Sequence, residues 1–321
     1  MSEGDERESF QPEPPAIPAG DRGVLQRVFV SDSRLRPIWR FVVAGLLAYG
    51  VNYIAGGIAF TALQGHPMLA DATYRALALV ILAGCFRLLL ELLDEEQGDP
   101  WVSMGLPRGK GALRDALLGM LIGSGMIALA VAAMATLGHF SPVIHFSSAS
   151  VAKLIAVTLG LLFGAMLEEM MFRGYPFQRL IESFGAAWAV LVLSALFGAV
   201  HFFNPHNGGP WSWEFLDTLA VGVLLAVAYL RTRSLWMPFG IHFAWNFALG
   251  VVMGLPVSGL KDFGVVVHTT VTGPRWITGG AYGLEGSVTG VVVILVGFIP
   301  LLWFTRKHGG AAGANFPQTG I

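Results

Sequence analysis

Eight long apolar segments dominate the sequence, at roughly 38–62, 74–93, 114–136, 151–173, 186–203, 215–230, 236–255 and 285–305. Each is long enough to cross the hydrocarbon core of a bilayer, or nearly so, because a membrane helix needs about 20 apolar residues. Hydrophobic residues make up 54% of the 321-residue chain and charged residues only 13%, which excludes an ordinary soluble domain. The sequence therefore predicts an all-α, polytopic membrane helix bundle with about eight transmembrane helices.

Three regions follow from this pattern. Residues 1–37 are polar, Pro-rich and charged, which predicts a disordered cytoplasmic tail. Residues 38–306 form the predicted transmembrane domain, and residues 307–321 form a second cytoplasmic tail.

Basic residues set the predicted orientation of the bundle. They concentrate in the N-terminal tail, in the even-numbered loops and at the C-terminus, whereas the odd-numbered loops contain only Arg75, Lys153, Lys261 and Arg275. The positive-inside rule therefore places both termini in the cytoplasm. We expect an integral multi-pass protein of the plasma membrane whose surroundings are the lipid bilayer, and the absence of a basic stripe predicts no nucleic-acid partner.

The fourth apolar segment ends with three charged residues, Glu168, Glu169 and Arg173. An ionised side chain near the middle of a membrane helix costs roughly 2.5–3.5 kcal/mol on insertion scales, so each needs a partner or a purpose. Glu169 and Arg173 are four residues apart, share a helix face and can pair. Glu168 points about 100° away and has no partner on its own helix, which makes it a functional-site candidate.

Small-residue strips accompany these charges. Gly119-x-x-x-Gly123 and Gly160-x-x-x-Gly164 have the spacing that lets helices pack closely. Glu168 continues the second strip four residues after Gly164, so its carboxylate is predicted to point toward a neighbouring helix rather than toward lipid.

Two histidines extend the polar constellation to other segments. Segment 5 ends with Phe197 and His201 on one face, and segment 7 places His242 and Asn246 at i, i+4. A lone histidine on an apolar face is more often a hydrogen-bonded core residue than a ligand. Here, however, three membrane segments each place chemically competent groups on one face. This combination favours a shared functional site over isolated core residues.

Glu168-Glu169-x-x-x-Arg173, Phe197-x-x-x-His201 and His242-x-x-x-Asn246 follow one another in successive predicted helices. This ordered set resembles the three signature motifs of the CAAX prenyl protease and bacteriocin-processing family, also called the Abi family, whose members are intramembrane endopeptidases. The similarity covers about residues 150–255. It implies a bundle of about eight spans with a catalytic cavity that opens within the membrane toward the cytoplasm.

The resemblance also implies roles for the six residues. Glu168 and His201 would activate the attacking water, Glu169 and Arg173 would shape the site, and His242 and Asn246 would hold a metal or the oxyanion. Two histidines and a carboxylate match the ligand set of a catalytic zinc. His201 and His242 are therefore candidate metal ligands with zinc as cofactor, and the sequence does not separate this mechanism from water activation by Glu168 and His201 alone.

The predicted function is hydrolysis of a peptide bond in a membrane-anchored protein or peptide. Prenylated CAAX proteins, bacteriocin leader peptides and membrane-anchored regulators all remain open as substrates. A proton- or ion-coupled transporter is the alternative from another class, because intramembrane Glu, His and Arg residues also mark ion paths. A non-catalytic bundle whose polar cluster fixes helix packing is a third reading, but it leaves Glu168 unexplained.

Overall fold

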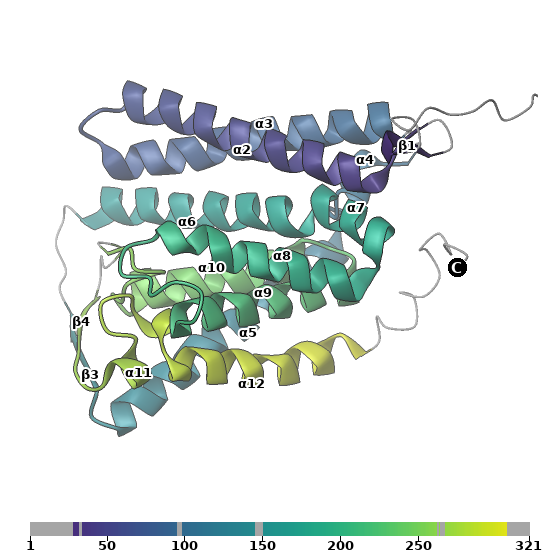
Figure 1. Cartoon of the computed structure of the whole chain (residues 1–321). Coiled ribbons are helices and arrows are strands. Elements are labelled where there is room, and N and C mark those ends of the chain that lie inside the picture. The colour runs from purple at the N-terminus through teal and green to yellow at the C-terminus, as the bar shows by residue number, and fades with distance from the viewer. Residues whose placement is uncertain are drawn as a thin grey trace, which may run out of the picture.

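Figure 1 shows the computed structural model of the chain, which describes residues 28–31, 34–94, 98–144, 150–261, 263 and 267–306. The longer helices are α2 (Pro37–Ala62), α3 (Pro67–Leu93), α5 (Lys110–Thr136), α6 (Ser150–Arg173), α8 (Ala186–Val200), α9 (Trp213–Thr232), α10 (Trp236–Asn246) and α12 (Val288–Phe304). The predicted C-terminal tail lies outside the described residues, as does most of the predicted N-terminal tail.

Short elements connect or extend these helices. The short helices are α4 (Pro100–Ser103), α7 (Tyr175–Phe184), α11 (Arg275–Thr278), the 3-10 helices η1 (His201–Phe203) and η3 (Leu284–Gly286), and the π-helix η2 (Phe247–Val252). Strand β1 (Val30–Ser31) pairs antiparallel with β2 (Arg34–Leu35), and β3 (Phe140–Ile144) pairs antiparallel with β4 (Val267–Val271). The β3–β4 pair ties the connection before α6 to the connection before α12.

The predicted fold class is confirmed, because each of the eight apolar segments forms a helix in an all-α membrane bundle. In the part of the chain that the structure describes, six stretches are long and apolar enough to cross a membrane: α2, α3, α5, α6 with α7, α8 with η1, and α9. The other two are shorter, since α12 has 17 residues and α10 has 11 before it continues as η2.

One boundary changes the placement of a charge. Helix α3 begins at Pro67, where proline is favoured in the first helical turn, rather than near residue 74. Arg75 therefore lies inside a membrane helix. The prediction that it lies in an outer loop was wrong.

The bundle has two distinct ends (Figure 1). The start of α2, the α6–α7 junction and the end of α12 lie at one end, which we call the termini end. Strands β3 and β4 and helix α11 lie at the other, which we call the loop end. Helix α2 packs on α3, α3 on α6, α6 on α10, and α10 on α5, so α6 and α10 occupy the middle of the bundle.

Close packing of α5 on α10 depends on the first predicted glycine strip. A Cβ atom added at Gly119 would overlap the carbonyl oxygen of Met237, and one at Gly123 would overlap that of Ile241. The backbones of the two helices therefore meet where both glycines lack a side chain, as the spacing predicts.

This packing predicts a position-specific effect of alanine. Gly123→Ala should lower the free energy of unfolding by about 1–3 kcal/mol, because α5 must move away from α10. Gly125→Ala on the same helix is the matched control, since its added methyl group would meet no atom within 4 Å, and it should be neutral or stabilising by up to about 1 kcal/mol. Thermal unfolding in detergent compares the two variants, and equal stabilities would contradict the packing described here.

Candidate active site

A buried ion pair lies near the termini end of α6. Arg173 Nη1 is 3.2 Å from Glu169 Oε1, and both side chains are fully buried. The guanidinium also donates from Nη2 to the carbonyl oxygen of Gly222 at 3.0 Å and lies 4.6 Å from the centre of the Phe197 ring. The predicted i, i+4 pair is therefore present, and it joins α6 to α8 and α9.

His242 extends this pair to α10. Its Nδ1 donates to Glu169 Oε1 at 2.8 Å, so one carboxylate oxygen accepts from both Arg173 and His242. The other nitrogen of the ring, Nε2, lies 3.7 Å from Glu168 Oε2. Glu169 thus fixes the orientation of the imidazole, with Nε2 directed toward Glu168.

Glu168 differs from Glu169 in exposure and in partners. Its side chain keeps 29% of its accessible surface, whereas that of Glu169 keeps none. Its nearest basic side chains are on other helices: Arg75 Nη1 of α3 lies 3.9 Å from Oε1, and His242 Nε2 of α10 lies 3.7 Å from Oε2. The prediction that Glu168 has no partner on its own helix and faces a neighbouring helix agrees with these contacts.

The second glycine strip makes room for that neighbour. A Cβ atom at Gly164 would overlap the Arg75 guanidinium, and one at Gly160 would lie 3.0 Å from Asp71 Oδ2. Asp71 accepts from Arg75 Nε at 2.8 Å. The Asp71–Arg75 pair of α3 therefore lies along the glycine face of α6 and ends at Glu168.

His201 lies where α8 turns into η1. Its Nδ1 is 2.7 Å from the carbonyl oxygen of Phe197, and a carbonyl can only accept, so Nδ1 carries the hydrogen. Nε2 is then the basic nitrogen of the ring. The Phe197 ring also contacts the His242 ring edge-to-face, with centroids 6.1 Å apart.

One cavity of about 280 Å³ collects four of the six predicted site residues. It is lined by Glu168, His201, His242 and Asn246. Glu169 and Arg173 lie behind this wall and support it without lining it. The cavity is large enough for several water molecules or a short peptide segment.

Three further charged residues belong to this region and were missed by the sequence analysis. Arg75 and Glu285 line the cavity, and Asp71 holds Arg75. The i, i+4 spacing of Asp71 and Arg75 was a usable signal, but Arg75 was assigned to an outer loop and Asp71 was not considered. Glu285 precedes α12 and carried no recognisable pattern.

Glu285 links three elements at the cavity wall. Its carboxylate accepts from the Trp245 indole at 2.9 Å, from the Ser258 hydroxyl at 3.2 Å and from the Ser258 backbone N–H. Burial raises the pKa of the Glu285 carboxyl, and the hydrogen bonds from Ser258 and Trp245 oppose that rise. Trp245 precedes Asn246 in α10, so Glu285 fixes the chain beside a predicted site residue.

The donor set does not match a zinc site in the arrangement observed. A catalytic zinc takes three protein ligands and a water, and among the described residues no group of three or more His, Cys, Asp or Glu side chains is placed to hold a metal. We therefore derive no catalytic step through a metal.

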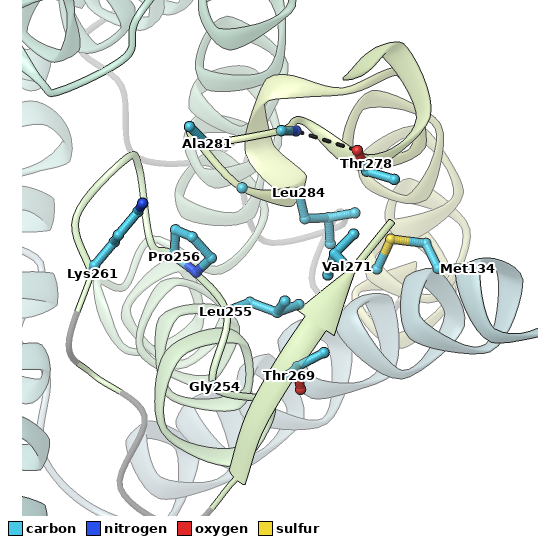
Figure 2. A pocket seen from close by; sticks show the side chains of 12 residues that line it. Met134, Gly254, Leu255, Pro256, Lys261, Thr269, Val271, Thr278, Ala281 and Leu284 are labelled. Atoms are coloured by element: carbon cyan, nitrogen blue, oxygen red, sulfur yellow. Dashed lines mark hydrogen bonds between the residues drawn. The ribbon is translucent and has the colours of Figure 1, made fainter. Parts of the chain in front are cut away.

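A second cavity, of about 300 Å³, lies at the loop end (Figure 2). Its walls include Met134 of α5, Thr269 and Val271 of β4, and Leu284 of η3. None of the six predicted site residues lines it. This second cavity is therefore separate from the one that contains the ionisable cluster.

Comparison with known proteins connects this geometry to a family. Residues 150–248 match the model of the family described as Rce1-like, type II CAAX prenyl endopeptidase. This match confirms the predicted resemblance over a segment that contains all six predicted site residues.

Two relatives from Bacillus subtilis (strain 168) are also similar. The chain is 30% identical to the protein named "Putative membrane peptidase YdiL" over 99 residues, which is 31% of this chain and 37% of the relative. It is 29% identical to "Uncharacterized protein YyaK" over 145 residues, 44% of each protein. The chain thus spans less than half the length of these curated relatives, and no solved structure matches it.

The buried network predicts different consequences for the two glutamates. Glu169→Gln should lower the free energy of unfolding by roughly 3–5 kcal/mol, because it strands the buried Arg173 charge. Adding Arg173→Gln should recover part of that loss, and a double-mutant cycle of thermal unfolding in detergent measures the coupling.

The exposed Arg87–Glu91 pair, with the same spacing and an N···O distance of 2.8 Å, is the control. Glu91→Gln should change the stability by less than about 1 kcal/mol, as expected of a solvated pair. Strictly additive effects at Glu169 and Arg173 would contradict the assigned network.

Proposed function

We propose that this protein is an intramembrane endopeptidase that hydrolyses a peptide bond of a membrane-anchored protein or peptide. The observation that carries the proposal is the cavity inside the bundle, which is lined by a partly exposed carboxylate, Glu168, together with two histidines and an asparagine. The Rce1-like match over residues 150–248 supports the same class of reaction.

Glu168 is the proposed general base. Its partial exposure to the cavity lets its carboxylate contact a water molecule, and Arg75 and His242 lie beside its two oxygens. The carboxylate takes a proton from the water as the oxygen attacks the carbonyl carbon of the scissile bond. It then passes that proton to the leaving amide nitrogen as the C–N bond breaks, which balances the hydrolysis. General base catalysis of this kind contributes typically 10²–10⁴-fold.

His201 is the proposed second contact of the water. Because Nδ1 donates to the Phe197 carbonyl, Nε2 is left as a hydrogen-bond acceptor. A water held by both Nε2 and the Glu168 carboxylate has a defined orientation, which favours one line of attack.

His242 and Asn246 are the proposed oxyanion stabilisers. When both nitrogens of His242 are protonated, Nδ1 donates to Glu169 and Nε2 can donate into the cavity. The Asn246 amide lies one turn further along α10 and lines the same cavity. Donors positioned in advance for the oxyanion are usually a large contribution to such catalysis.

Glu169 and Arg173 are proposed as positioning residues. Both are fully buried, so neither contacts a substrate in the cavity. Their contribution is to hold His242 in one orientation and to compensate charge inside the bundle.

The base assignment predicts the effect of a shape-conserving change. Glu168→Gln should reduce cleavage of a membrane-embedded peptide by at least about 10²-fold, because an amide cannot accept the proton. The variant should purify and unfold like the wild type, since Glu168 is partly exposed. Glu91→Gln, at an exposed position on α3, should retain full cleavage. Wild-type rates in Glu168→Gln would rule out the assigned role, and ion transport without cleavage would favour a carrier.

Metal dependence is tested separately. Water activated by Glu168 and His201 should be insensitive to chelators, whereas a metal held by His201 and His242 should be removable and zinc should restore activity. We predict unchanged cleavage rates after chelation, with metal content of the purified protein measured in parallel. Loss of activity on chelation and recovery with zinc would establish the metal mechanism instead.

A further inference from the structure

We propose that Arg75 of α3 is a positioning residue for the reaction, and that Asp71 and Arg75 together hold the Glu168 carboxylate in place while leaving its oxygens free to contact water. The role of Glu168 as the base comes from the proposed function, on which this inference rests. Asp71 and Arg75 lie outside the segment 150–248 that matches the family model. This part of the site is therefore supplied by the N-terminal helices of the bundle.

The guanidinium of Arg75 is shared between two carboxylates. Its Nε donates to Asp71 Oδ2 at 2.8 Å, and its Nη1 lies 3.9 Å from Glu168 Oε1. An arginine presents its N–H groups in a rigid planar fork, so a partner on one nitrogen fixes the direction of the others. Asp71 thus sets the orientation of the fork, and Nη1 is left beside Glu168.

A second ion pair on α3 shows that the spacing alone does not give this arrangement. Arg87 and Glu91 are also four residues apart and also have an N···O distance of 2.8 Å. Their side chains are 51% and 42% exposed, whereas that of Arg75 is 23% exposed and lines the catalytic cavity. The two pairs share their local geometry and differ in what surrounds the arginine.

The two glutamates of α6 are held in different ways. Glu169 Oε1 is a hydrogen-bond acceptor, with Arg173 at 3.2 Å and His242 at 2.8 Å. The basic groups beside Glu168 are farther away, with Arg75 at 3.9 Å and His242 at 3.7 Å, and charged hydrogen bonds are usually 2.7–2.9 Å long. Glu168 therefore lies beside two basic side chains and keeps its lone pairs available for a water molecule, as a general base requires.

The glycine face of α6 determines where the guanidinium lies. A Cβ atom at Gly164 would overlap Arg75 Nη1 and would lie 3.1 Å from its Cδ and Cζ atoms, and one at Gly160 would lie 3.0 Å from Asp71 Oδ2. A side chain at position 164 would therefore push the guanidinium away from Glu168. This contact offers a way to move Arg75 without changing any charge.

The neighbouring residues fix α3 at the same cavity wall. Tyr74 donates its hydroxyl to Asn52 Oδ1 of α2 at 2.6 Å, and Asn52 Nδ2 donates to the Ala48 carbonyl oxygen at 2.8 Å. Tyr74 and Asn52 line the cavity together with Arg75. The wall made by α2 and α3 is thus held by its own hydrogen bonds, which keeps Arg75 in register with Glu168.

Steady-state cleavage of a membrane-anchored peptide by the purified full-length protein in proteoliposomes tests this role. Arg75→Gln should lower kcat by about 10- to 100-fold, because misplacing a catalytic group by about 1 Å can cost on the order of 10²-fold. KM should stay within about twofold, since the lost interaction acts on the transition state and not on substrate binding. Arg75→Lys should recover part of the rate because it keeps the charge without the fork. An unchanged kcat in Arg75→Gln, or a loss confined to KM, would overturn the proposal.

A double variant separates positioning from helix packing. Asp71→Asn with Arg75→Gln removes the pair as a unit and leaves neither partner stranded, so thermal unfolding in detergent should approach that of the wild type. Its kcat should remain as low as that of Arg75→Gln alone. Recovery of kcat together with stability would show that the pair only supports packing. Arg87→Gln with Glu91→Gln, the matched pair on the same helix, should retain full kcat.

Gly164→Ala provides an independent test that preserves every charge. Its added methyl group displaces the Arg75 guanidinium, so kcat should fall in the same direction as in Arg75→Gln. Gly84→Ala on α3 is the control, because its methyl group would meet no atom within 4 Å. Wild-type kcat in Gly164→Ala would contradict the proposed placement.

Failure of the proposed function is distinguishable from failure of this inference. If the wild type leaves the peptide intact, the proposed function fails, and thermal unfolding still decides whether Arg75 acts on Glu168. Glu168→Gln should leave the wild type unchanged but should stabilise Arg75→Gln, in which Asp71 and Glu168 have lost their shared guanidinium. Equal effects of Glu168→Gln in the two backgrounds would contradict the contact.

Discussion

The single carboxylate oxygen that accepts from both Arg173 and His242 is the interaction on which the site depends. Glu169 is completely buried, so its charge is tolerated only because two donors from different helices meet it. Those donors join α6 to α10, and Arg173 adds the Gly222 carbonyl of α9. Helix packing and imidazole orientation are thus set by one network, in which Glu169 and Arg173 are fully buried behind the cavity and the partly exposed Glu168 lines it.

Glycines on α5 and α6 determine which other helices pack closely beside this network. Because Gly160 and Gly164 have no side chains, the Asp71–Arg75 pair of α3 can lie along α6 and end beside Glu168. Gly119 and Gly123 similarly let α5 support α10 from behind. Small residues in α5 and α6 therefore let side chains and backbones of distant segments approach closely.

Local patterns were predictable from the sequence and distant contacts were not. The Glu169–Arg173 pair follows from helical spacing, and the helices follow from apolar length. The sequence could not show that His201 and His242 share a cavity, because that depends on α8 ending after 15 residues and on α10 being short. Arg75 was misplaced because α3 begins earlier than the apolar run, and Glu285 was missed because its partners, Trp245 and Ser258, lie far away in the chain.

The central claim, that the Glu168 cavity hydrolyses a peptide bond, is tested most directly by cleavage in oxygen-18 water. The purified protein in proteoliposomes would be incubated with a membrane-anchored peptide, and the products would be analysed by mass spectrometry. The account predicts one heavy oxygen in the new C-terminal carboxylate, formed by wild type and not by Glu168→Gln. An intact peptide, or a labelled product formed equally by both proteins, would contradict it.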